Sequence, residues 1–325
     1  IIVSCNKDQM VPAAQIDASL RSMVANSAPD GDLDYWLLPQ ADDLASIPQD
    51  PQNPLTEEKV ELGKFLFFET AFGTEAAQEE MIGTYSCATC HIPEAGFRPG
   101  SAQGIADGGV GFGINGEDRV RNTSYSEIEM DVQGARPLSL ISVAFVENTM
   151  WNGSFGSTNV NIGTEDKWVG DLVTNNLGLQ GIEAQNIEGM EVHKFHVTPE
   201  LVEEYGYKEM FDNVFAEYPE EERYSNFTAS FAVSAYIRTL FPNKAPFQEW
   251  IQGNMQAMNA AEKNGAMLFF GKAACTNCHS GPGLSSVEFH AIGVDDMFMR
   301  PSFRTDETDL RNLGRGGFTE DPTDF

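Results

Sequence analysis

Basic side chains are scarce in this sequence. Its 325 residues hold 20 Lys and Arg against 49 Asp and Glu, which gives a formal net charge of −29. A chain this negative repels phosphate backbones, so nucleic acid is not an expected partner. The charge favours a basic protein partner, although an acidic surface that only keeps the protein soluble explains it equally well. Apolar runs are short too, and none approaches the ~20 residues that a membrane span needs.

Cysteine and histidine are also rare, with five of each. Four of the cysteines nevertheless fall in two copies of one pattern, Cys87-Ala88-Thr89-Cys90-His91 and Cys275-Thr276-Asn277-Cys278-His279. Two thiols one helical turn apart can each add to a vinyl group of one porphyrin, and the adjoining imidazole can then bind the iron. Zinc half-sites or thioredoxin-like redox pairs are the alternatives, but neither needs a histidine directly after the second cysteine. The pattern predicts two covalent c-type haems.

The fifth cysteine, Cys5, follows Ile1-Ile2-Val3-Ser4 and is typical of the end of a lipoprotein signal peptide, although an ordinary free cysteine is the alternative. Haem attachment of this kind takes place outside the cytoplasmic membrane. We therefore expect a periplasmic or cell-envelope protein that contacts the membrane only through a lipid anchor at Cys5.

An internal repeat predicts the architecture. Gly63-Lys64-Phe65-Leu66-Phe67-Phe68 precedes the first motif, Gly265-Ala266-Met267-Leu268-Phe269-Phe270 precedes the second, and Glu-Lys lies just upstream in both. One helix-then-haem unit is therefore used twice. Almost no period-2 alternation is present, so the predicted fold is mainly α, with two cytochrome-c-like haem domains in tandem. We expect a lipoprotein N-terminus and tether over 1–55, a first haem domain over 56–245 and a second over 246–325.

Local signals predict three helices and one loop. Thr56 caps a helix that carries the first repeat, Pro199 opens a second, and residues 227–240 form a third. The glycine-rich run 104–116 lacks the Lys-Ser/Thr of a phosphate-binding loop, and a loop lying close over a haem face suits it better.

These pieces, together with Trp151-Asn152-Gly153, resemble the bacterial di-haem cytochrome c peroxidases, a family that includes di-haem enzymes oxidising partner proteins. The resemblance implies that the haem on His91 reacts with hydrogen peroxide. It implies that the haem on His279 accepts electrons from a small cytochrome c or cupredoxin, which the net charge predicts to be basic. It also implies a calcium ion and makes Trp151 an electron relay between the haems, although a core tryptophan is the plain alternative.

Peroxide cleavage needs a carboxylate that moves a proton between the two oxygens, and the family places a glutamate there. Its alignment favours Glu188, with Glu183 a close second. A solvated acid is the alternative for either one in so acidic a chain.

Two departures from the family matter. Phe112 stands where many members carry a histidine that closes the resting peroxidatic iron, so we expect an open iron unless His193 or His196 closes it. The second haem domain also looks truncated, since the family's methionine ligand to that haem comes from later sequence. Met297 and Met299 could take that role but are better explained as apolar filler.

The sequence therefore predicts a di-haem peroxidase. The rivals are a di-haem enzyme that oxidises a partner protein or an organic substrate, and a non-catalytic electron carrier with both irons closed.

Mass spectrometry tests the haem assignment. We expect the mature chain to carry two covalent haems, because both motifs are complete. An apo mass, or the mass of a single haem, would contradict it.

Overall fold

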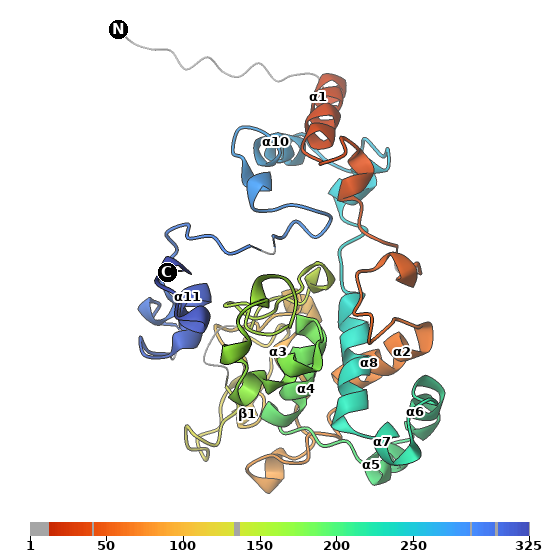
Figure 1. Ribbon diagram of the computed structural model, residues 1–325, viewed down its shortest axis with the longest axis vertical. Helices are drawn as coiled ribbons and strands as arrows, with labels where there is room; N and C mark the ends of the chain where they lie inside the picture. The colour runs from red at the N-terminus through yellow and green to blue at the C-terminus, as the bar shows by residue number, and fades with distance from the viewer. Residues whose placement is uncertain (1–12, 41, 133–136, 287, 303–304, 325) are drawn as a thin grey trace. The chain divides into compact units, whose positions relative to one another are not determined.

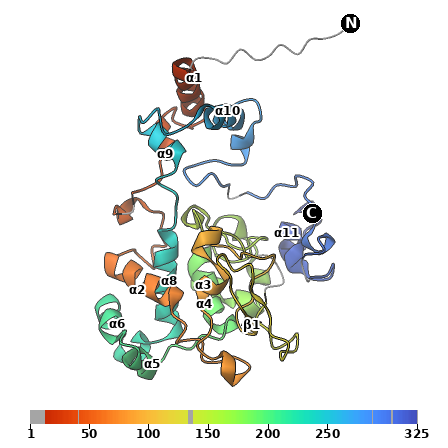
Figure 2. The same ribbon diagram turned by 180° about the vertical axis from the view of Figure 1, so that it is seen from behind.

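The computed structural model of the chain describes residues 13–40, 42–132, 137–286, 288–302 and 305–324. Its described residues are mainly helical, which confirms the mainly α part of the predicted fold class (Figure 1). The helices that carry the argument below are α1 (Ala13–Asn26), α2 (Glu57–Phe68), α3 (Cys87–Cys90), α4 (Gly181–Val192), α5 (Pro199–Glu204), α6 (Lys208–Val214), α7 (Glu220–Arg223), α8 (Asn226–Arg238), α9 (Pro246–Ile251), α10 (Ala260–Phe269) and α11 (Gly314–Thr319). Figure 2 shows them from behind. None of the described helices is long and apolar enough to cross a membrane.

The glycine-rich run contributes the first strand of the one sheet in the described ranges. Strand β1 (Gly109–Val110) pairs antiparallel with β2 (Val120–Arg121), Gly109 opposite Arg121. Two residue pairs make a marginal hairpin, so its position depends on what it packs against.

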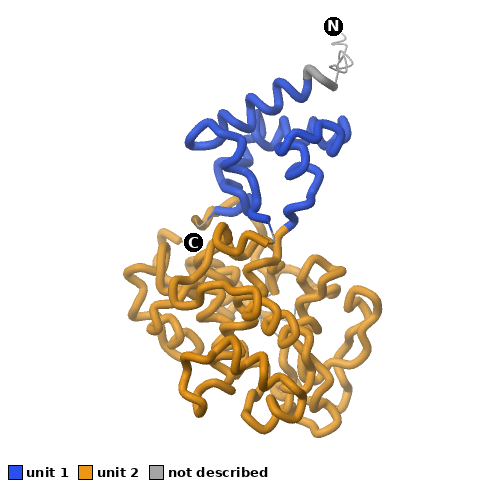
Figure 3. The backbone as a smooth tube through the Cα atoms, turned by 90° about the vertical axis from the view of Figure 1, so that its right-hand side faces the viewer, with its two compact units in different colours: residues 1–40, 242–286 blue, residues 41–241, 287–325 orange. Residues whose placement is uncertain are grey.

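The chain divides into two compact units (Figure 3). Unit 1 holds residues 1–40 and 242–286, and unit 2 holds 41–241 and 287–325. The second Cys-x-x-Cys-His motif lies in unit 1 and the first in unit 2. Residues 287–325, which we expected within the second haem domain, group with unit 2 because buried Arg315 bonds to Asn161 Oδ1 at 2.7 Å.

Unit 1 is built on α1 and α10, which pack against each other with η1 (Leu33–Trp36) and α9. Its buried side chains include Leu20, Val24, Trp36, Trp250 and Phe270. At its centre Asp17 accepts hydrogen bonds from Trp250 Nε1 (2.8 Å) and Lys263 Nζ (3.0 Å), so the buried charges of Asp17 and Lys263 compensate each other.

Much of the expected tether belongs to unit 1. Residues 13–26 form α1, because Ile16, Leu20 and Val24 recur at helical spacing and bury one face. Trp36, in the one apolar patch of that stretch, is fully buried and donates from Nε1 to Val24 O at 3.1 Å. Cys5 lies outside the described residues, so its acylation stays a prediction.

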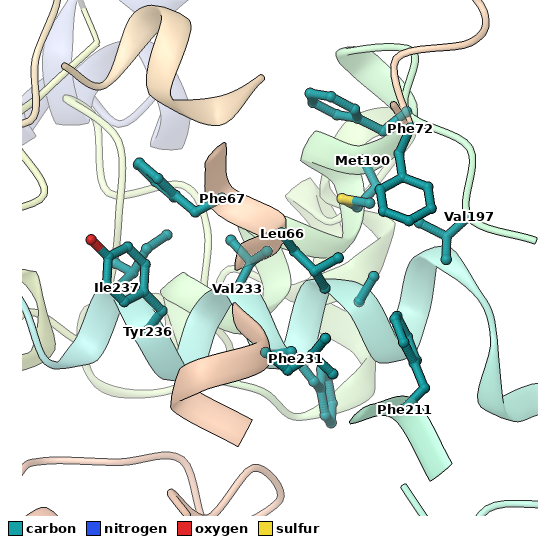
Figure 4. Packing of buried hydrophobic residues seen from close by; sticks show 14 of the residues in the cluster. Leu66, Phe67, Phe72, Met190, Val197, Phe211, Phe231, Val233, Tyr236 and Ile237 are labelled. Atoms are coloured by element: carbon teal, nitrogen blue, oxygen red, sulfur yellow. The ribbon is translucent and has the colours of Figure 1, made fainter. Parts of the chain in front are cut away.

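Unit 2 is centred on the crossing of α2 and α8. Helix α2 begins where predicted, with the Thr56 side chain accepting from Lys59 N, and α8 agrees with the predicted 227–240 within two residues. Helix α5 begins at Pro199, also as predicted. Figure 4 shows Leu66 and Phe67 of α2 packed beside Val233 and Tyr236 of α8. A Cβ on Gly63 would lie 1.8 Å from Ala232 O, so only glycine allows this approach of the two backbones.

The repeat seen in the sequence reappears in α2 and α10. In both helices the repeated Glu-Lys places a buried lysine in the first turn. Lys59 Nζ donates to Asn53 Oδ1 at 3.0 Å and to Pro54 O at 2.8 Å, and Lys263 Nζ donates to Asp17 and to Met255 O. Each lysine thus ties the start of its helix to the preceding segment.

The repeat supplies a matched test of the helix crossing. We expect Gly63→Ala to lower the free energy of unfolding by about 3 kcal/mol, because a methyl group there forces two backbones apart. In α10, a Cβ on Gly265 meets no atom within 4 Å, so Gly265→Ala should be neutral or stabilising by up to about 1 kcal/mol. Thermal or denaturant unfolding measures both, and equal effects would contradict the crossing.

Candidate haem sites

The first motif forms a single helical turn. Ser86 and Thr89 make a reciprocal capping box at the start of α3, which fixes the turn that carries both cysteines. Cys87 and Cys90 are free thiols and half-buried. Burial raises the pKa of both thiols to about 12, so they stay protonated at neutral pH.

The His91 ring is fixed by one hydrogen bond. Its Nδ1 lies 3.1 Å from Phe97 O, and a carbonyl can only accept, so Nδ1 carries the proton. Burial lowers the pKa of His91 to about 4 against the raising effect of this bond, which keeps the imidazole neutral. The lone pair is therefore on Nε2, the atom that would bind iron.

The second motif repeats this arrangement. Cys275 and Cys278 are free and half-buried, on a 3₁₀ turn, η9 (Cys275–Asn277). His279 Nδ1 lies 3.0 Å from Leu284 O, so this ring also presents Nε2. Each histidine has the same tautomer, set by a backbone carbonyl.

These residues fit covalent haem and do not fit zinc. No three His, Cys, Asp or Glu side chains in the described ranges converge on a common point, the two motifs included. A tetrahedral zinc site requires such convergence, whereas a c-type haem takes its two thiols and its imidazole at separate points.

The glycine-rich run packs against the first motif. A Cβ on Gly104 would lie 2.7 Å from Cys90 Sγ, so glycine allows the loop to lie against the thiol. Phe112, beyond β1, has 39% of its surface exposed. Its carbonyl accepts from Asp118 N at 3.1 Å within the hairpin.

Glu183 is committed to a buried ion pair. Arg238 of α8 donates to it from Nε at 2.8 Å and from Nη2 at 2.5 Å, and Asn53 Nδ2 adds a third bond at 3.2 Å. The side chains of Glu183 and Arg238 are both inaccessible to solvent. This carboxylate therefore connects α4 to α8.

Glu188 is the freer carboxylate. It lies five residues further along α4, which places it about 140° around the helix from Glu183. It is half-buried, and within the described ranges its carboxylate has no hydrogen-bond donor or cation as a partner. Burial, together with the charges of Asp171 and Glu191, raises the pKa of Glu188, as a group that carries protons needs.

Trp151 lies in a loop that buried amides hold in place. Asn161 Nδ2 donates to Gly153 O at 2.9 Å, and Asn175 Nδ2 donates to Ser154 O at 2.8 Å. Thr149 Oγ1 donates to Gly181 O at 3.0 Å, which ties this loop to the start of α4. The Trp151 side chain itself has 42% of its surface exposed, so it is not a core tryptophan in unit 2.

His193, at the end of α4, is paired with Asp131. The distance from Nδ1 to Oδ2 is 2.7 Å. Burial opposes the charge on His193, but Asp131 outweighs it, and the pKa of His193 is raised. Its charge adds a smaller contribution to the lowered pKa of His91, beside the larger effect of burial. His196 is half exposed and faces Glu75 at 3.9 Å.

Four residues of these sites were not predicted from the sequence: Phe97, Leu284, Asp131 and Arg238. A sequence pattern could have pointed to Phe97 and Leu284, since each is an apolar residue directly after a glycine. Phe97 lies six positions beyond His91, and Leu284 lies five positions beyond His279. No sequence pattern pointed to Asp131 or Arg238, because nothing in the sequence distinguishes them from the other charged residues.

The chain is similar to known di-haem proteins. The family profile described as di-haem cytochrome c peroxidase matches residues 57–256. Methylamine utilization protein MauG of Methylorubrum extorquens is 28% identical over 250 residues, which cover 77% of this chain and 57% of that protein. Cytochrome-c peroxidase IdrP1 of Denitromonas iodatirespirans is 26% identical, over 84% of this chain and 59% of its own length. The chain thus spans less than two thirds of these relatives.

A solved structure is similar in fold. It is a MauG-like protein associated with microbial copper homeostasis, with a TM-score of 0.53 and 22% identity, covering 89% of this chain and 72% of that one. At this identity the likeness extends to the fold alone.

The pair of His193 with Asp131 predicts a pH dependence. A raised folded pKa means that the pair stabilises the fold fully below the unfolded value of about 6.5 and loses that effect as pH rises through the folded pKa. Asp131→Asn keeps a hydrogen-bond acceptor and removes the charge, so it should cost on the order of 1 kcal/mol at pH 5. Unfolding followed from pH 5 to 9 should show this cost shrinking, and a cost that is constant or grows would contradict the pairing.

Proposed function

Since the chain belongs to the di-haem cytochrome c peroxidase family, we propose that it reduces hydrogen peroxide to water with electrons from a small redox protein. The observation that carries the proposal is the duplicated motif, in which each histidine ring is fixed with Nε2 free. The family implies two c-type haems, and oxidoreductases are what its members have in common.

Haem iron would supply the site that binds peroxide and takes up electrons. The protein's part is proton transfer and positioning. His91 would hold the iron of the peroxidatic haem and His279 that of the electron-transfer haem. Glu188 would move a proton between the two oxygens of peroxide, since burial and its acidic neighbours raise its pKa and so favour the proton-carrying form over that of an exposed carboxylate.

Glu183 suits this role less well. Its carboxylate already accepts bonds from Arg238 and Asn53, and moving it would leave a buried guanidinium unpaired. We therefore assign the acid–base role to Glu188.

The first iron is proposed to be open when the protein is fully oxidised. Phe112 offers no lone pair, and His193 uses Nδ1 to bond Asp131. Peroxide would then react without prior reduction of the second haem. Trp151 remains the proposed electron relay, and its loop is fixed by buried amides, as a relay requires.

The donor is proposed to be a basic cytochrome c or cupredoxin, supported by the net charge of −29. A periplasmic or cell-envelope location with a lipid anchor at Cys5 is likewise a proposal. So is calcium, for which the described His, Cys, Asp and Glu side chains form no cluster of three. Haem domains over 56–245 and 246–325 also stay a proposal.

A second candidate is the oxidation of a partner protein or organic substrate, which the similarity to a methylamine utilization protein favours. Turnover with a reduced cytochrome supports the peroxidase, whereas oxygen insertion into a substrate supports this rival. A carrier with both irons closed would show no spectral change with peroxide.

Two glutamine variants test the assignment. Glu188→Gln should slow peroxide cleavage by about 10²–10⁴-fold and leave the fold and both haems intact. Glu183→Gln should instead lower the free energy of unfolding by about 3–5 kcal/mol, because it leaves Arg238 buried without its counter-charge. Stopped-flow peroxide reaction of the fully oxidised protein, together with chemical unfolding, separates the two effects. A ferric spectrum that does not respond to peroxide until one electron is added would refute the open iron.

A further inference from the structure

The two carbonyls that accept from the histidine rings belong to strained residues. Phe97 has φ +54° and Leu284 has φ +50°, both in the left-handed region. Bulky L-residues rarely adopt this conformation, because their Cβ crowds the neighbouring carbonyl oxygen. Only eight non-glycine residues in the described ranges have it, and two of those eight each follow a Cys-x-x-Cys-His motif and offer their carbonyl to its histidine.

Local contacts keep Phe97 in this conformation. Its N–H donates to Ile92 O at 2.8 Å, and Ile92 also pairs with Arg98 in an isolated antiparallel bridge. The Phe97 ring lies 6.1 Å from that of Phe67 in the core of unit 2. The loop therefore turns back beside His91 and presents the Phe97 carbonyl to Nδ1.

The second motif reaches the same arrangement by a different loop. Five residues separate His91 from Phe97, whereas four separate His279 from Leu284. The Leu284 N–H donates to Gly281 O at 3.0 Å, and Gly281 has φ +68°. Two loops of unequal length thus both end in a left-handed apolar residue whose carbonyl meets Nδ1, so this geometry is what the two sites share.

We propose that Phe97 and Leu284 are positioning residues, whose left-handed backbones aim a carbonyl at the proximal histidine and thereby set its orientation and donor strength. This inference rests on the proposed attachment of haem at both motifs. A carbonyl that accepts from Nδ1–H increases the basicity of Nε2 and fixes the ring plane. Stronger donation favours ferric over ferrous iron, so each carbonyl holds down the reduction potential of its own haem.

The alternative is that Phe97 acts only through the packing of its ring. Substitutions that change backbone preference separately from size distinguish the two. Isoleucine keeps bulk, but its β-branch makes the left-handed region far less accessible. Glycine removes the side chain and adopts this region freely. Leu284→Ile is the sharpest change, because the two side chains are isomers.

The experiment uses the holoprotein, with haem content measured first by mass spectrometry. The potential of each haem is followed separately by electron paramagnetic resonance during a redox titration. The Fe–His stretch is measured by resonance Raman where the iron is five-coordinate. Phe97→Leu serves as the size control, and Leu284→Ile reports on the second haem.

We expect Phe97→Ile to raise the potential of the first haem and weaken its Fe–His stretch while the second haem stays unchanged, and Leu284→Ile to raise only the potential of the second haem. Phe97→Leu should match the wild type. Phe97→Gly should lower the unfolding temperature and leave the potential near its original value.

Two haems with potentials that the isoleucine variants do not move would overturn the positioning role alone. A potential that shifts as much in Phe97→Gly as in Phe97→Ile would assign Phe97 to packing and overturn it as well. A wild-type chain lacking a haem contradicts the haem sites themselves, and the inference falls with them.

Discussion

The contact of two helix backbones at Gly63 is the constraint on which unit 2 depends. With no side chain at this position, α2 can lie against Ala232 of α8, and the apolar faces of both helices close over one core. Helix α4 joins the same α8 through Glu183 and Arg238, and Asn186 Nδ2 adds a bond to Ser234 Oγ at 2.8 Å. Helix α2 fixes α8, and α8 in turn fixes α4. The candidate side chains on α4 are therefore positioned by the packing of α2 against α8.

Two acids on one helix can then serve different purposes. Glu183 has a structural role, since Arg238 neutralises its charge in the core. Glu188 faces elsewhere, keeps its carboxylate free and is shifted towards protonation by burial and acidic neighbours. The environment that each side chain meets, rather than its residue type, separates a structural carboxylate from a candidate for proton transfer.

The similar proteins include more than one kind of di-haem protein, so they limit the proposed activity to a small set of reactions. The chain belongs to a family whose members include proteins named as peroxidases and a protein named for methylamine utilization. The covalent haem motif and its fixed histidine would serve any of these chemistries, because the site prepares an iron and does not by itself select the substrate. Substrate and donor choice would depend on what reaches the iron and on what docks to a strongly acidic surface.

The sequence alone determined the parts that depend on local chemistry. Residue spacing identifies the two Cys-x-x-Cys-His motifs and the repeat of α2 in α10, and capping identifies the helix start at Thr56. Both signals act over a few residues. The mainly helical fold followed from periodicity.

The tertiary structure decided what depends on distant partners. Residues 13–40 fold into unit 1 because α10, some 240 residues away, covers their apolar face. Glu183 and Glu188 could not be separated until Arg238 and Asn53 were seen to surround only one of them. The Phe97 and Leu284 carbonyls reach their histidines through backbone torsions that residue identity does not reveal.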